Sequence, residues 1–171
     1  MMQRTSGIDL FHKITREMKS VLSIIMCIVS LYSWSQDATA IRKKNFNLND
    51  DGIAIKGYDP VSYFTKGEAV KGKKELAVYH QGATYYFSST ENKEAFKKTP
   101  SAYEPQYGGW CAYAMGAKGE KVSIDPETFK IINGKLYLFY NRAFNNTLKS
   151  WNKDEQHLKQ NADTNWQTIF H

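Results

Sequence analysis

Cysteine is scarce in this chain, and the scarcity limits how the chain can be held together. Only two of the 171 residues are cysteines, Cys27 and Cys111. Cys27 lies in an apolar run, residues 21–31, that has the features of an export signal, so Cys111 is the one thiol expected in the mature protein. A single thiol forms no internal disulfide. It is buried filler, an intermolecular link, a reactive group or a metal ligand.

The chain also lacks a long hydrophobic stretch. Residues 21–31 are too few to span a bilayer comfortably, which takes roughly 20 residues. Lys19 precedes this run and polar residues 32–36 follow it, which predicts a secretory signal peptide over residues 1–36, with 1–17 as a possible mis-start. We therefore expect export, periplasmic or secreted, and no stable membrane span in the mature form. A retained N-terminal membrane anchor is the alternative.

Several functional signatures are missing as well. The chain has no glycine-rich phosphate loop, no paired carboxylates and no cofactor fingerprint. Its net charge of +6 is dispersed, without an aromatic-plus-basic RNA motif or a groove-reading helix, which argues against nucleic-acid binding. The sequence favours a protein that is not an enzyme.

What is present indicates one α+β domain of small antiparallel hairpins with packed helices. Residues 37–50 are polar and predict a flexible lead-in, and residues 51–169 predict the domain with a C-terminal helical tail. Turn residues Gln81-Gly82 and Asn133-Gly134 each separate two strand-like runs. The predicted strands are residues 75–80 with 83–88, and 129–132 with 135–140.

Capping residues locate the expected helices. Pro60 suits the first turn of a short helix over residues 61–65. Ser88 and Glu91 have the spacing of a capping box and predict a helix that stops before Pro100. Asn141 is the expected cap of the helical tail.

Several segments resemble the YHS domain family. The residues are Tyr79-His80-Gln81 with the strand after them, the earlier Gly57–Phe64, and Tyr107–Ala112, which is similar to an exported branch of the family. The resemblance spans roughly residues 52–166. It implies a small treble-clef-like metal-binding module, often linked to heavy-metal handling.

The chain departs from that family where metal-binding relatives carry cysteine. Those positions are Ser62, Ser88 and Asn92 here. A serine hydroxyl is a poor substitute for thiolate toward a soft metal, so the standard cysteine pairs of the family are lacking.

The remaining metal-ligand candidates are Cys111, His80 and Met115. Together these donors favour copper, with zinc as the second choice. We therefore expect an exported YHS-type domain that binds a metal ion. If Ala112 begins a helix, Cys111 lies at its positive end, which favours the thiolate.

Two alternatives remain open. Cys111 and His80 would form a nucleophile and base in a thiol-dependent enzyme or redox protein, if the fold brings them together. A module without metal would bind a small ligand or a protein instead, in an aromatic pocket around the thiol. The candidate rings for that pocket are Trp110, Tyr107, Tyr113 and Tyr58.

Overall fold

The structure, a computed structural model, describes residues 12, 16–18 and 39–170. The apolar run with Cys27 lies outside the described residues, so the signal peptide and its cleavage stay predictions. Residues 39–171 belong to one compact unit that begins at Thr39. Among the described residues, no helix combines the length and apolar character needed to cross a bilayer.

Two antiparallel hairpins form where the turn residues predict them. β1 (Lys73–His80) pairs with β2 (Ala83–Phe87), and β3 (Asp125–Ile132) pairs with β4 (Lys135–Phe139). Gln81 and Asn133 adopt positive φ angles of 44° and 50°, each followed by a glycine that tolerates the same conformation. A third, very short hairpin joins β5 (Asn141–Arg142) to β6 (Asn145–Asn146).

Short helices connect and cover these hairpins. They are η1 (Ile55–Gly57), α2 (Ser62–Thr65), α3 (Thr90–Lys98), α4 (Pro100–Tyr103), η2 (Gln106–Gly109), α5 (Ala112–Lys118), α6 (Thr147–Trp151) and α7 (Glu155–Phe170). The hairpins with packed helices make an α+β fold, as the sequence predicts, and the treble-clef likeness stays a prediction. Two predicted caps are wrong. Ser89 caps α3 in place of Ser88, and Asn146 caps α6 in place of Asn141, which lies in β5.

The segment before the domain contains a helix. Residues 39–45 are helical within the predicted flexible lead-in of residues 37–50. Arg42 donates hydrogen bonds to the carbonyl of Gln81 and to Glu104, and Asn45 is only 8% exposed. These partners lie far along the chain, so the local polar composition does not reveal the helix.

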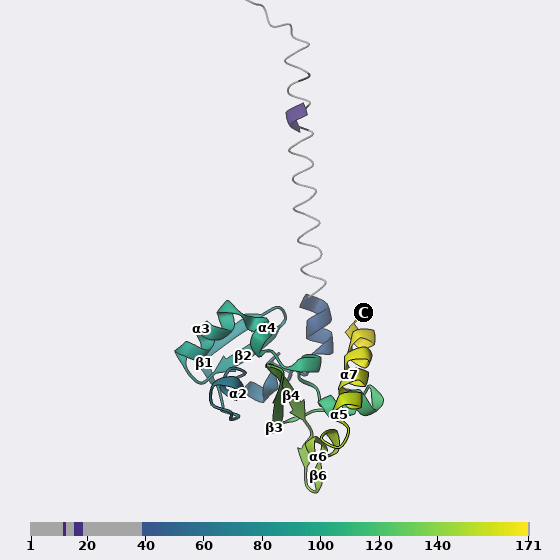
Figure 1. The fold of residues 1–171 in the computed structure, drawn as a ribbon. Helices are drawn as coiled ribbons and strands as arrows, with labels where there is room; N and C mark the ends of the chain where they lie inside the picture. The colour runs from purple at the N-terminus through teal and green to yellow at the C-terminus, as the bar shows by residue number, and fades with distance from the viewer. Residues whose placement is uncertain (1–11, 13–15, 19–38, 171) are drawn as a thin grey trace, which may run out of the picture. The chain divides into compact units, whose positions relative to one another are not determined.

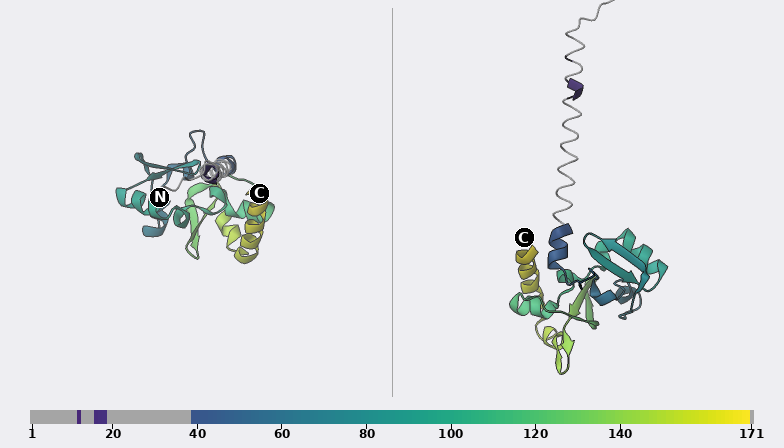
Figure 2. Two further views of the ribbon diagram at one scale, coloured as in Figure 1. Left: turned by 90° about the horizontal axis from the view of Figure 1, so that it is seen from above. Right: turned by 180° about the vertical axis from the view of Figure 1, so that it is seen from behind.

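β4 divides the hydrophobic core into two clusters. Leu136 and Leu138 face a first cluster that includes β2 and α3, whereas Tyr137 and Phe139 face a second cluster that includes Trp151. Side chains alternate between the two faces of a strand, so one strand serves both clusters. β1, β2 and α3 lie on one side of the β3–β4 hairpin, and α5 and α7 lie on the other (Figures 1 and 2).

Candidate functional site

A buried carboxylate collects hydrogen bonds from three separate segments. Asp59 is 0% exposed. Its Oδ1 accepts from the backbone N–H of Val61 at 2.9 Å. Its Oδ2 accepts from the Ser88 N–H at 2.8 Å, the Ser88 hydroxyl at 2.6 Å and the Asn92 amide at 2.7 Å. The Ser62 hydroxyl lies 2.8 Å from the backbone oxygen of Asp59. We call Asp59, Ser62, Ser88 and Asn92 the Asp59 cluster.

The same carboxylate influences a neighbouring tyrosine. Burial, and then the charges of Tyr58, Asp125 and Asp59, raise the pKa of Tyr63 far above its ordinary value. The hydroxyl therefore stays protonated and donates a 2.9 Å hydrogen bond to the carbonyl of Pro126. This bond ties α2 to the start of β3.

Ala112 does begin a helix, so Cys111 occupies the N-cap position of α5. Its N–H donates to the carbonyl of Val122 at 2.9 Å. Its Sγ accepts from the N–H of Tyr140 at 3.3 Å and lies 3.4 Å from the Thr147 hydroxyl. The residue is 0% exposed, and Leu138 lies opposite it in an isolated β-bridge.

His80 lies in a different environment. It is the last residue of β1, where it pairs with Ala83. Its half-buried ring packs edge-on against Phe96 at 5.9 Å between centroids. The polar partners of the Cys111 sulfur are instead Tyr140 and Thr147, so the contacts of the thiol and those of the imidazole involve different residues.

Met115 lies one turn after Cys111 in α5, and its backbone N–H donates to the Cys111 carbonyl at 3.0 Å, but its side chain packs in a different cluster. It is 0% exposed and packs in the second core cluster with Tyr107, Tyr137 and Trp151, whereas Cys111 belongs to the first cluster. Within residues 39–170 and the few described before them, no three His, Cys, Asp or Glu side chains gather as a metal-ligand group. Cys111, His80 and Met115 each have their own set of side-chain neighbours, and metal binding by the three together stays a prediction.

The thiol instead lies beside a cavity of about 400 Å³. We call it the Cys111 cavity. Its walls are mainly apolar and come from α5, the segment after α5, the residue that follows β4, β6 and the start of α6. The lining residues are Cys111, Tyr113, Ala114, Ala117, Lys118, Glu120, Val122, Tyr140, Asn145 and Thr147.

Sequence reasoning found only part of this cavity. Of the four rings expected around the thiol, Tyr113 lines it. Tyr107 is in the second core cluster, and the Trp110 indole donates to the carbonyl of Asn45 at 2.6 Å. Tyr58 donates to Glu127. Tyr140 and Thr147 were missed because no sequence signal links them to a cysteine 29 or 36 residues away.

The model of the YHS domain family matches residues 61–107. This segment is a YHS domain. It contains α2, the β1–β2 hairpin, α3 and α4, and it includes His80 but not Cys111 or Met115. No curated protein and no solved structure matches the chain.

The fold brings together the three positions at which the YHS resemblance implies cysteine in metal-binding relatives. Ser88 and Asn92 both contact Oδ2 of Asp59, and Ser62 contacts its backbone oxygen. In this chain the three side chains hydrogen-bond to Asp59. The positions are thus neighbours in space, but oxygen and amide groups stand where a soft metal would need thiolates.

Proposed function

We propose that this protein is a YHS-type binding module that holds a small apolar molecule in the Cys111 cavity. The observation that carries the proposal is the cavity itself. Its volume of about 400 Å³ lies within the range of small-molecule sites, roughly 300–1,000 Å³. Its walls combine apolar side chains with a few polar groups, which is the usual composition of such sites.

The lining offers both apolar surface and uncharged polar groups, beside the charged side chains of Lys118 and Glu120. Tyr113, Val122 and Tyr140 supply aromatic and aliphatic surface. Thr147 and Asn145 supply a hydroxyl and an amide. An indole-sized ring that buries roughly 200 Å² gains about 5 kcal/mol from burial, and part of this gain offsets the loss of free motion. A simple probe should therefore bind with a Kd on the order of 1 mM, and a ligand that also uses the polar groups should bind more tightly.

Metal binding by Cys111, His80 and Met115 is the competing proposal. A soft metal requires its donors at bonding distance of one point. The fold instead gives the three side chains three different sets of neighbours. We therefore rank copper, and then zinc, below a small apolar ligand.

A thiol-dependent enzyme receives less support for the same reason. An activated cysteine needs a general base within hydrogen-bond reach. The polar neighbours of the Cys111 sulfur are the Tyr140 N–H and the Thr147 hydroxyl. Neither group is a base that would take the thiol proton.

Export is also part of the proposal. The compact unit begins at Thr39, shortly after the expected end of the signal peptide at residue 36. Cleavage there would leave the unit intact. N-terminal sequencing of protein recovered from the exported fraction should give a start near residue 37, and an intact N-terminus would contradict cleavage.

The binding proposal is tested by titrating the full chain with indole and following backbone NMR shifts. The shifts should concentrate at residues that line the Cys111 cavity. Ala117→Trp places a large ring in the lining, and we expect it to weaken indole at least fivefold. Ala102→Trp makes the same change at another exposed helical alanine, outside the lining, and should have no effect.

Two results would overturn the proposal. One is indole binding that is absent or equally strong in the Ala117→Trp variant. The other is stoichiometric Cu(I) or Zn(II) binding under reducing conditions that Cys111→Ala abolishes, which would favour the metal proposal.

A further inference from the structure

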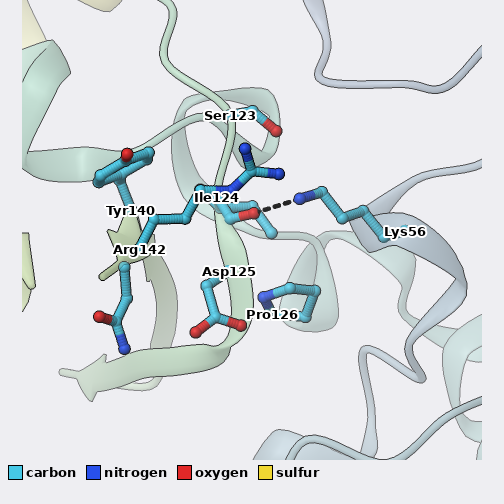
Figure 3. A pocket seen from close by; sticks show the side chains of 8 residues that line it. Lys56, Ser123, Ile124, Asp125, Pro126, Tyr140 and Arg142 are labelled. Carbon is cyan, nitrogen blue, oxygen red and sulfur yellow. Dashed lines mark hydrogen bonds between the residues drawn. The ribbon is translucent and has the colours of Figure 1, made fainter.

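A second cavity, of about 280 Å³, lies on another part of the surface. We call it the Lys56 cavity. It is formed by the η1 turn, the segment that enters β3 and the segment that leaves β4. Its lining residues are Lys56, Ser123, Ile124, Asp125, Pro126, Tyr140, Asn141 and Arg142 (Figure 3).

The backbone that presents Lys56 is strained. Ile55 and Lys56 both have a φ of 51°, a left-handed conformation that is costly for any residue with a Cβ and worst for a β-branched one. Ile55 is 2% exposed and anchors the turn in the core. Strain of this kind persists where the surroundings hold it, and it is common at ligand sites. Here the turn directs the Lys56 amino group to the carbonyl of Ile124 at 2.5 Å.

Two cationic groups converge in this cavity. Figure 3 shows the Lys56 ammonium and the Arg142 guanidinium pointing to the same space, with the Ser123 hydroxyl beside them. Within the part of the chain that the structure describes, neither cation is paired with a carboxylate. Lys56 donates to a backbone carbonyl, which leaves its charge uncompensated.

The third charged group in the cavity is already engaged by its own strand. Asp125 accepts hydrogen bonds from the Glu127 N–H at 3.1 Å and the Thr128 hydroxyl at 3.0 Å. With Lys56, Arg142 and Asp125 ionised, the cavity has one excess positive charge. A singly charged anion would bring the net charge of the occupied cavity to zero, whereas a doubly charged anion would leave it with one excess negative charge.

We infer that the Lys56 cavity binds a small carboxylate with an apolar body. The planar guanidinium of Arg142 matches the two oxygens of a carboxylate, and the Lys56 ammonium adds a second charge-assisted donor. Ile124, Pro126 and Tyr140 provide apolar surface for the rest of the ligand. This site does not depend on the ligand of the Cys111 cavity, although Tyr140 lines both cavities.

Benzoate is the test ligand, titrated into the full chain at low salt and followed by NMR. We expect millimolar binding that weakens as salt is added, because the cations are exposed. The shifts should appear at Ser123 and at the Arg142 side chain. Benzyl alcohol, which has a similar ring without the charge, should not bind there.

Substitutions of single residues test whether benzoate binds in the Lys56 cavity. Arg142→Gln should weaken benzoate at least tenfold, and Lys56→Gln should weaken it severalfold. Lys153→Gln removes one exposed cation outside the lining and should leave the affinity unchanged. Ala117→Trp, which blocks the Cys111 cavity, should also leave it unchanged, so this inference and the proposed function fail separately.

Three results would overturn the inference. The first is an absence of saturable benzoate shifts at the cavity. The second is an affinity that Arg142→Gln does not lower. The third is tighter binding of inorganic phosphate than of benzoate, which would assign the cavity to a more highly charged anion.

Discussion

The Asp59 cluster and the Cys111 cavity each include one fully buried side chain, a carboxylate and a thiol, but the surroundings of these two groups differ. The Asp59 carboxylate accepts hydrogen bonds from Val61 just before α2, from Ser88 just after β2 and from Asn92 in α3. Each of its two oxygens therefore has a partner. The Cys111 sulfur also has two polar neighbours, yet it borders empty space of about 400 Å³.

This difference separates a structural role from a binding role. A buried polar group whose hydrogen bonds are all made holds segments together and has nothing left for a ligand. A weakly polar sulfur beside an apolar cavity leaves room for a molecule to enter. In this chain the positions where the YHS resemblance implies cysteine are occupied by side chains that bond to Asp59, and the Cys111 cavity is lined by residues beyond the segment 61–107 that matches the family.

The largest expected effect is the loss of the Asp59 carboxylate. Asp59→Ala removes the acceptor of the fully buried Val61 N–H and of the partly buried donors of Ser88 and Asn92. Each unsatisfied donor costs roughly 1–3 kcal/mol, so we expect the free energy of unfolding to fall by about 4 kcal/mol in urea denaturation. Asp59→Asn keeps one oxygen and should cost less.

Asp51→Ala is the matched control, because Asp51 is an exposed aspartate nearby in the sequence. Its effect should stay within about 0.5 kcal/mol. If Asp59→Ala is equally mild, the Asp59 cluster does not hold the segments together and the contrast with the Cys111 cavity disappears.

The second prediction concerns the reactivity of the Cys111 thiol. Because the residue is 0% exposed, N-ethylmaleimide should label it about a hundredfold more slowly in the folded chain than in urea. Saturating indole should slow the labelling further, because the probe fills the space beside the sulfur. Peptide mass mapping separates Cys111 from Cys27. Labelling as fast as in urea would instead support an accessible, reactive thiol.

The hairpins were predictable from sequence because their signals are local. Gln81-Gly82 and Asn133-Gly134 supply the positive φ angles that tight turns need, and the strands on either side follow.

The candidate sites depend on contacts that no local pattern contains. Ser88 has the spacing of a helix cap, yet its hydroxyl bonds to Asp59, 29 residues earlier, and Ser89 caps α3 instead. Likewise, Tyr140 and Thr147 reach Cys111 only after β4 and α6 have packed. The local sequence around each of these positions therefore does not indicate which distant residue it contacts.

The smallest effect tests whether the Asp59 cluster keeps the geometry of a metal site. Ser88→Cys with Asn92→Cys places two thiols where the present side chains lie 3.4 Å apart, next to the Asp59 carboxylate. Two thiolates and a carboxylate suit zinc, so we expect Zn(II) affinity to rise about tenfold above that of a control pair. The control is Glu94→Cys with Lys98→Cys, which has the same spacing on exposed positions of α3 but no contact with Asp59. Equal affinities, measured by competition with a chelator, would mean that Asp59 contributes no ligand and that the Asp59 cluster does not have the geometry of a zinc site.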